Sequence, residues 1–136
     1  MKRSGWILLL SIFICLGCSP KISENDLGQL NGYWRIDFIT HKSESFQPKG
    51  MTKLLDHYTL EQRKGIRKKV QPMIDNKFLI TDDQNSFSIV YEGMDCFVQF
   101  ETKWDQWREK IIKLNETELI LEHQEKKYHY VRYITD

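Results

Sequence analysis

The amino-acid sequence predicts an all-β protein, an up-and-down antiparallel β-barrel of eight or nine strands. From Gly32 to the C-terminus, short runs of β-branched and aromatic residues recur about every 8–12 residues. Gly, Pro, Asn and Asp separate the runs as turn residues. Because the connections are short, we expect consecutive strands to pair as antiparallel neighbours, which is typical of a meander that closes into a barrel.

Length and composition limit the organisation and the partners. The chain has 136 residues, which favours a single domain, and it is 40% hydrophobic and 29% charged, which excludes a disordered chain. The formal net charge is only +1, with 20 Lys and Arg against 19 Asp and Glu. Such a balance offers no strongly basic field for nucleic acid, so we expect no nucleic-acid partner. We also expect the protein to be a monomer.

The N-terminus has the pattern of an export signal. Lys2 and Arg3 precede an apolar run from Trp6 to Cys15, which is about half the length of about 20 residues that a spanning helix needs. A short basic region, a short apolar region and small residues predict a signal peptide over residues 1–17.

The residues after this run, Leu16-Gly-Cys-Ser-Pro20, resemble the lipobox of bacterial lipoproteins, although Leu16 stands one place closer to the Cys than usual. The resemblance implies that Cys18 receives a diacylglyceryl group and anchors the chain to a membrane of the bacterial cell envelope. Ser19 is not the Asp of an inner-membrane retention signal, so an outer-membrane or surface location is favoured if the cell has two membranes. The alternative is an ordinary signal peptide cut nearby, which would leave a free thiol.

Processing at this point would define the mature chain. Residues 18–30 would be the lipidated Cys and a polar tether, and residues 31–136 the barrel domain. With Cys15 removed and Cys18 acylated, Cys96 would have no partner for an internal disulfide, so stability must come from the core.

The strands are placed by alternation and by β-propensity. In Tyr33–Ile39, Trp34, Ile36 and Phe38 share one face. The region from His41 to Lys53 is the longest stretch without a strand pattern and is expected to hold a short helix or a lid. The other predicted strands are Leu54–Glu61, Ile66–Gln71, Lys77–Thr81, Phe87–Tyr91, Phe97–Glu101, Glu109–Leu114, Thr117–His123 and Tyr128–Tyr133.

The start of the first strand, Gly32-Tyr-Trp34, resembles the Gly-x-Trp signature of the lipocalins, many of which also carry an Arg on the last strand, here Arg132. More closely, residues 30–134 are similar to the short lipocalin-like domains of bacterial lipoproteins, which begin with Leu-x-Gly-x-Trp. The resemblance implies an eight-stranded up-and-down barrel with an apolar interior. It also implies that Gly32, Trp34 and Arg132 close one end, with Arg132 stacked on the Trp34 ring.

The interior decides between two functional interpretations. Strand parity places Ile36, Phe38, Tyr128 and Tyr130 as the lining of a cavity suited to a small apolar ligand with one polar handle. The chain would then be a lipid-anchored envelope lipoprotein that binds a small hydrophobic molecule in its barrel. Alternatively, side chains fill the interior, as eight strands allow, and the protein has a structural or protein-interaction role without a ligand.

A basic segment, Arg63–Lys69, places five positive charges in seven residues. It would contact anionic lipid head groups, or it is a solvated hairpin with Arg67 and Lys69 pointing outward; the sequence favours the solvated hairpin.

Signals for catalysis are weak. The four histidines, His41, His57, His123 and His129, lack metal-binding spacing, and no nucleophile or phosphate-binding motif is present. We therefore expect no catalytic residue, no metal and no cofactor.

Overall fold

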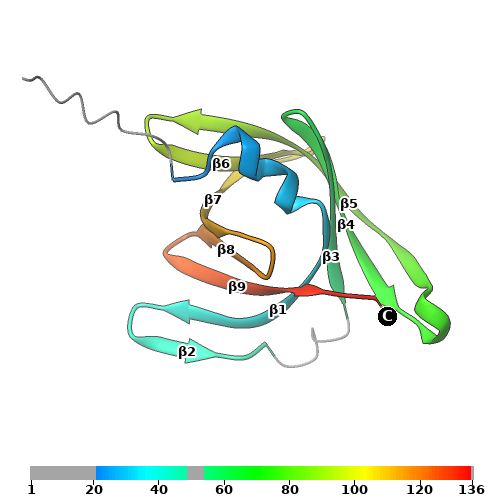
Figure 1. Ribbon diagram of the computed structural model, residues 1–136. Coiled ribbons are helices and arrows are strands. Elements are labelled where there is room, and N and C mark those ends of the chain that lie inside the picture. Colours follow the sequence, from blue (N-terminus) through cyan, green and yellow to red (C-terminus); the bar gives the residue numbers. More distant parts are fainter. Residues whose placement is uncertain (1–20, 49–53, 136) are drawn as a thin grey trace, which may run out of the picture.

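The computed structural model describes residues 21–48 and 54–135 (Figure 1). The predicted signal peptide and Cys18 lie outside the described residues. The described part of the chain forms nine strands and two short 3₁₀ helices. In chain order these are η1 (Glu24–Leu30), β1 (Gly32–His41), β2 (Glu44–Phe46), β3 (Leu55–Glu61), β4 (Lys64–Pro72), η2 (Ile74–Asn76), β5 (Phe78–Glu92), β6 (Asp95–Glu101), β7 (Gln106–Leu114), β8 (Glu118–His123) and β9 (Lys126–Tyr133).

The strands form a closed antiparallel barrel. From β3 to β9, each strand pairs with the next strand along the chain. β1 then pairs with β9 on one side and with β3 on the other, which closes a barrel of eight strands (Figure 1). β2 is an additional short strand that pairs with the far end of β1. The predicted up-and-down barrel is therefore confirmed.

The β1–β9 seam contains an irregularity that reverses the faces of β1. The pairing register shifts between Ile36 and Phe38. A bulge inserts one extra residue, so the alternation of faces changes beyond it. Ile36 and Ile39 both face the interior cavity, whereas Phe38 stacks on His129 with ring centroids 4.1 Å apart. The prediction that Phe38 lines the cavity was wrong, because strict alternation does not allow for the bulge.

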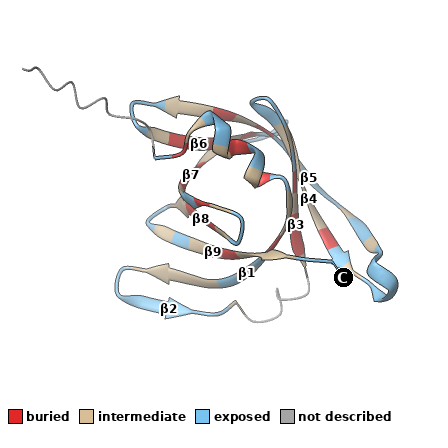
Figure 2. Ribbon diagram, in the orientation of Figure 1, coloured by how far each residue is buried: buried red, intermediate tan, exposed pale blue. Residues whose placement is uncertain are grey.

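The expected tether is part of the fold from Ile22 onward. Ile22, Leu27 and Leu30 are buried in the core, and η1 lies across one end of the barrel (Figure 2). At the start of η1, the Ser23 hydroxyl donates a hydrogen bond of 2.8 Å to the Asp26 carboxylate. These three apolar residues, spaced among polar ones, cover the barrel end that would otherwise expose its core.

Two other boundaries differ from those expected. The predicted strands Lys77–Thr81 and Phe87–Tyr91 are parts of one 15-residue strand, β5. Asp82 and Asp83, expected as turn residues, instead lie in a register irregularity of this strand, where Lys68 pairs with Gln84 and Val70 pairs with Ile80. Asn85, also expected in a turn, pairs with Arg67. In the region where a helix or lid was expected, residues 44–46 form β2, and residues 49–53 are outside the described part.

The core occupies the end of the barrel that η1 covers. Its largest fully buried side chains include Trp34, Tyr58, Phe100 and Leu119. Phe87 stacks edge-on against both Tyr58 and Phe100, with centroids 5.7 Å apart in each pair. Among residues 21–48 and 54–135, no helix is long and apolar enough to cross a membrane.

Candidate functional site

The half of the barrel away from η1 contains a cavity of about 240 Å³. Its position follows from β1: Trp34 packs in the core beneath η1, whereas Ile36 and Ile39, further along the strand, line the cavity. The volume is below the range of about 300–1,000 Å³ that is usual for ligand pockets, so only a small molecule fits. The lining residues are Ile36, Ile39, Pro48, Leu54, Asp56, Arg67, Lys69, Glu109, His123, Tyr128 and Tyr130.

An ion pair across the barrel forms the floor of the cavity. Arg67 on β4 and Glu109 on β7 are 3.2 Å apart, and their side chains are only 13% and 10% exposed. The Arg67 guanidinium lies 4.2 Å from the centre of the Phe100 ring, which belongs to the core, and Trp107 Nε1 donates a 3.0 Å hydrogen bond to Glu109. The pair thus separates the filled half of the barrel from the open half.

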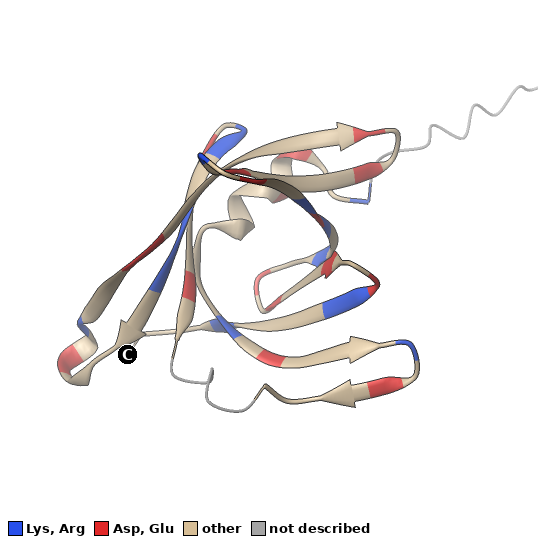
Figure 3. Ribbon diagram, turned by 180° about the vertical axis from the view of Figure 1, so that it is seen from behind, with Lys and Arg blue, Asp and Glu red and all other residues tan. Residues whose placement is uncertain are grey.

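A second ion pair lies on the cavity wall. Asp56 and Lys69 are direct cross-strand partners on β3 and β4, and Lys69 Nζ is 2.5 Å from Asp56 Oδ1. The Asp56 side chain is only 2% exposed. Figure 3 shows basic positions on β4 beside an acidic position on β3. The four charged residues of the described lining therefore form two pairs, and their charges sum to zero.

The phenols and the guanidinium in the interior keep their protons. Burial raises the pKa of Tyr130 well above its ordinary value, and burial also raises the pKa of Tyr128. Both are hydrogen-bond donors at neutral pH. Burial alone would lower the pKa of Arg67, but Tyr58, Glu109 and Asp56 outweigh it and raise that pKa, so the guanidinium stays charged.

His123 lies at the edge of the cavity with a defined proton position. Its Nδ1 is 2.8 Å from the backbone carbonyl oxygen of Arg108. A carbonyl only accepts, so Nδ1 carries the hydrogen of this hydrogen bond. In residues 21–48 and 54–135, no group of three or more His, Cys, Asp and Glu side chains could hold a metal ion.

The structure corrects the expectation for the basic segment. Arg67 and Lys69 do not point into water but into the barrel, where Glu109 and Asp56 hold them. The sequence pattern of β4 does not reveal these contacts, because Asp56 lies on the neighbouring strand β3 and Glu109 lies across the barrel on β7. Asp56, a carboxylate directly after two leucines in a predicted strand, was the available signal in the sequence.

The rest of this segment should contribute little to stability. Lys64 is exposed, and Lys68 is on the opposite face of β4 from Arg67 and Lys69. We expect Lys64→Gln and Lys68→Gln each to change the free energy of unfolding by less than about 0.5 kcal/mol, because surface replacements usually do so. Urea denaturation followed by circular dichroism measures it. A loss of about 2 kcal/mol for either variant would show that these side chains are paired or buried.

The residues expected to close the barrel lie together beneath η1. The Arg132 guanidinium lies over the Trp34 ring, 4.2 Å from its centroid, so the expected stacking is present. Gly32 has a φ of +124°, and a Cβ atom there would lie 2.6 Å from Arg132 Nη1, so the missing side chain gives the guanidinium its space. Arg132 also donates to the carbonyl oxygens of Asn31, Gln29 and Glu116. Gly32, Trp34 and Arg132 do not line the cavity.

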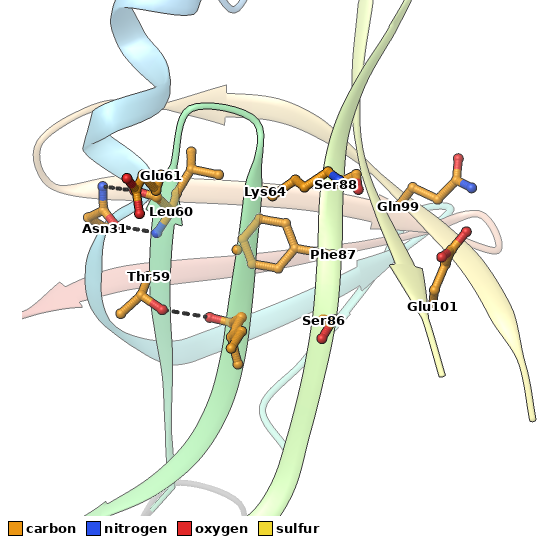
Figure 4. Close-up of a pocket in the computed structure, with 12 residues that line it drawn as sticks. Asn31, Thr59, Leu60, Glu61, Lys64, Ser86, Phe87, Ser88, Gln99 and Glu101 are labelled. Carbon is orange, nitrogen blue, oxygen red and sulfur yellow. Dashed lines mark hydrogen bonds between the residues drawn. The ribbon is translucent and has the colours of Figure 1, made fainter. Parts of the chain in front are cut away.

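A larger depression of about 590 Å³ lies over β3 to β6 (Figure 4). Its polar side chains, among them Thr59, Ser86, Ser88 and Gln99, are exposed or half-buried and alternate with the core residues of the same strands. It holds no buried polar side chain, in contrast to the interior cavity. The cavity, with its two buried carboxylates and the cations paired with them, is therefore the better candidate for a binding site.

Comparison with models of known protein families gave no match, and neither did comparison with curated protein sequences. Solved structures gave weak likenesses. A lipocalin-like protein from Bacteroides uniformis has a TM-score of 0.48 and 12% identity, over 78% of this chain and 100% of that chain. An uncharacterized protein from Bacteroides eggerthii has a TM-score of 0.48 and 7% identity, over 76% and 99%. Lobster apocrustacyanin A1 has a TM-score of 0.45 and 10% identity, over 85% and 72%. The strand pairing of this chain defines its barrel without reference to these structures.

Proposed function

We propose that this protein is a lipid-anchored, lipocalin-like envelope protein that holds a small molecule in the open half of its barrel. The cavity above the Arg67–Glu109 pair is the observation that supports the proposal. Buried ion pairs are often no more stabilising than well-packed apolar side chains, so a barrel that only had to be filled gains little from them. Around a cavity, the same groups can bind a ligand.

The two interpretations left open by the sequence each describe one half of the barrel. Beneath the floor, side chains fill the interior around Trp34 and Phe100. Above it, Ile36, Ile39 and Leu54 offer apolar surface, and Tyr128 and Tyr130 offer polar groups. This lining suits a small ligand with an apolar body and a polar end.

The binding proposal is tested by native mass spectrometry of the protein purified without denaturation, followed by solvent extraction. We expect a co-purified small molecule in the wild type and its loss in Ile36→Trp, which fills the cavity. Thr59→Trp, at an exposed position outside the cavity, is the matched control and should retain the molecule. Equal amounts in the wild type and in Ile36→Trp would show that the cavity does not bind it.

Anchoring through Cys18 is the second part of the proposal. Ile22, only four residues further along the chain, is buried in the core. Four residues span at most about 14 Å, so a lipid on Cys18 would hold this corner of the barrel close to the bilayer. The absence of an Asp after Cys18 favours an outer-membrane or surface location if the cell has two membranes.

We expect Cys18→Ser to move the protein to the soluble fraction or to leave its precursor uncleaved, because two or more acyl chains are what holds a protein stably on a membrane. Cell fractionation with immunoblotting measures the distribution, and Cys96→Ser serves as the control for loss of a thiol. Normal processing with full membrane retention of the Cys18→Ser protein would rule out this anchor.

A protein partner is a second candidate function, and a separate observation favours it. Four large apolar side chains at the β4–β5 tip, Met73, Ile74, Leu79 and Ile80, are 55%, 89%, 53% and 62% exposed. The tip projects beyond the barrel wall (Figure 1). Exposed apolar groups of this kind often mark interaction surfaces.

A further inference from the structure

We infer that the ligand of the cavity is electrically neutral and carries a head group that both donates and accepts hydrogen bonds. The inference rests on the proposed function, since it specifies the ligand of that same site. It follows from the charges of the lining. Among the described lining residues, the two cations, Arg67 and Lys69, and the two carboxylates, Glu109 and Asp56, are already paired with one another.

A charged ligand would break this balance. A carboxylate ligand would have to compete with Asp56 for Lys69 or with Glu109 for Arg67, and it would leave a buried carboxylate without its cation. An ammonium ligand would do the reverse and leave a buried cation unpaired. Uncompensated buried charges are strongly unfavourable, so the lining disfavours both ions.

A neutral polar head group finds partners without disturbing the pairs. An ammonium has three donors and a guanidinium has five, so Lys69 and Arg67 have donors beyond those used in their ion pairs. The carboxylates of Asp56 and Glu109 have more acceptor lone pairs than one ion pair uses, and Tyr128 and Tyr130 add phenols that stay protonated. A carboxamide or a hydroxyl-bearing head offers both a donor and an acceptor to this set.

The volume and the apolar walls of the cavity limit the size of the ligand and the nature of the part next to its head group. A volume of about 240 Å³ corresponds to roughly eight water molecules at about 30 Å³ each. Ile36, Ile39 and Leu54 line the same space, so an alkyl chain next to the head group has apolar surface to cover. The ligand class is thus a small neutral amphiphile, such as a primary amide or an alcohol with a short hydrocarbon chain.

Three probes of equal chain length test the inference: octanamide, octanoate and octylammonium, measured with the mature protein by isothermal titration calorimetry at pH 7. We expect octanamide to bind at least about tenfold more tightly than either ion, with Ile36→Trp abolishing its binding. A merely apolar cavity would also prefer a neutral probe, so variants that change the charge of the lining provide the decisive comparison.

The charge variants should redirect the preference. Asp56→Asn gives the lining a net positive charge, so the affinity for octanoate should rise at least about tenfold relative to the affinity for octanamide. Lys69→Met leaves a net negative lining and should favour octylammonium in the same way. The double variant Asp56→Asn with Lys69→Met is neutral again and should again prefer octanamide. Each variant is checked for folding by circular dichroism, and if one single variant fails to fold, the other still tests the reversal.

The outcomes separate the two proposals. If the wild type prefers an ion, or if neither folded single variant shifts the affinity ratio of its favoured ion to octanamide by about tenfold, the neutral ligand class is wrong while binding in the cavity stands. If no probe binds, or if Ile36→Trp binds octanamide as well as the wild type does, both the ligand class and the proposed function are overturned.

Discussion

Glu109→Leu should lower the free energy of unfolding by about 3–5 kcal/mol. The substitution introduces an apolar side chain of similar size and removes the carboxylate that lies 3.2 Å from Arg67. Arg67 is 13% exposed and would remain as a buried cation without its nearest counter-charge. Trp107 would also lose the acceptor of its indole N–H. Urea denaturation followed by far-UV circular dichroism measures the loss.

The double variant Arg67→Met with Glu109→Leu distinguishes the cost of an unpaired charge from the value of the pair. With both charges removed, the interior becomes an apolar layer, and we expect stability close to that of the wild type or above it. A double variant as unstable as Glu109→Leu alone would show that the ion pair itself holds the barrel together.

An exposed ion pair provides the matched control. Lys113 and Glu118 are 3.1 Å apart, similar to the distance in the buried pair, but their side chains are 48% and 46% exposed. Removing the carboxylate with Glu118→Ala should cost no more than about 1 kcal/mol, because water replaces the lost partner. Equal losses of unfolding free energy in Glu109→Leu and Glu118→Ala would contradict the burial of the Arg67–Glu109 pair.

Trp34→Ala should cost about 3–5 kcal/mol, as expected for truncation of a buried aromatic side chain. Trp34 is fully buried, and its indole N–H donates a 2.9 Å hydrogen bond to the Leu30 carbonyl oxygen, which ties β1 to η1. Arg132→Ala should cost less, since Arg132 is only partly buried, and Arg132→Lys should recover only part of that loss because Lys lacks the planar fork that reaches several carbonyl groups.

The two residues are in contact, so their effects should not add. We expect the double variant Trp34→Ala with Arg132→Ala to lose less than the sum of the single variants, with a coupling of at least about 0.5 kcal/mol. The cycle is measured by urea denaturation and circular dichroism, since removal of Trp34 changes the fluorescence. Strict additivity would mean that the stacking contributes nothing to closing the barrel.

The sequence predicted the regular parts of the fold. Alternation in β1 before the bulge identified Trp34 and Ile36 as inward-facing, and alternation in β9 identified Tyr128 and Tyr130. The Gly-x-Trp motif with Arg132 predicted which residues meet at the closed end. These features are local patterns or short motifs, so they are readable from one sequence.

The features that the sequence did not predict depend on tertiary partners. The bulge after Ile36 moves Phe38 to the other face, and no residue type marks its position. The segment before β1 looked like a tether because polar residues separate its few apolar ones, yet Leu27 and Leu30 gain burial from the barrel end. The two basic side chains of β4 that point into the barrel were expected to face solvent, because the carboxylates that pair with them lie on other strands.

A crystal structure of the mature protein, purified without denaturation, tests most directly whether side chains fill only one half of the barrel and leave a binding cavity in the other. We expect a bound molecule or ordered water in contact with Tyr128, Tyr130 and Lys69, above an intact Arg67–Glu109 pair. Beneath that pair we expect continuous side-chain packing around Phe100. Protein side chains filling the space above the pair, or an Arg67 side chain turned outward into solvent, would contradict a binding cavity with a charged floor.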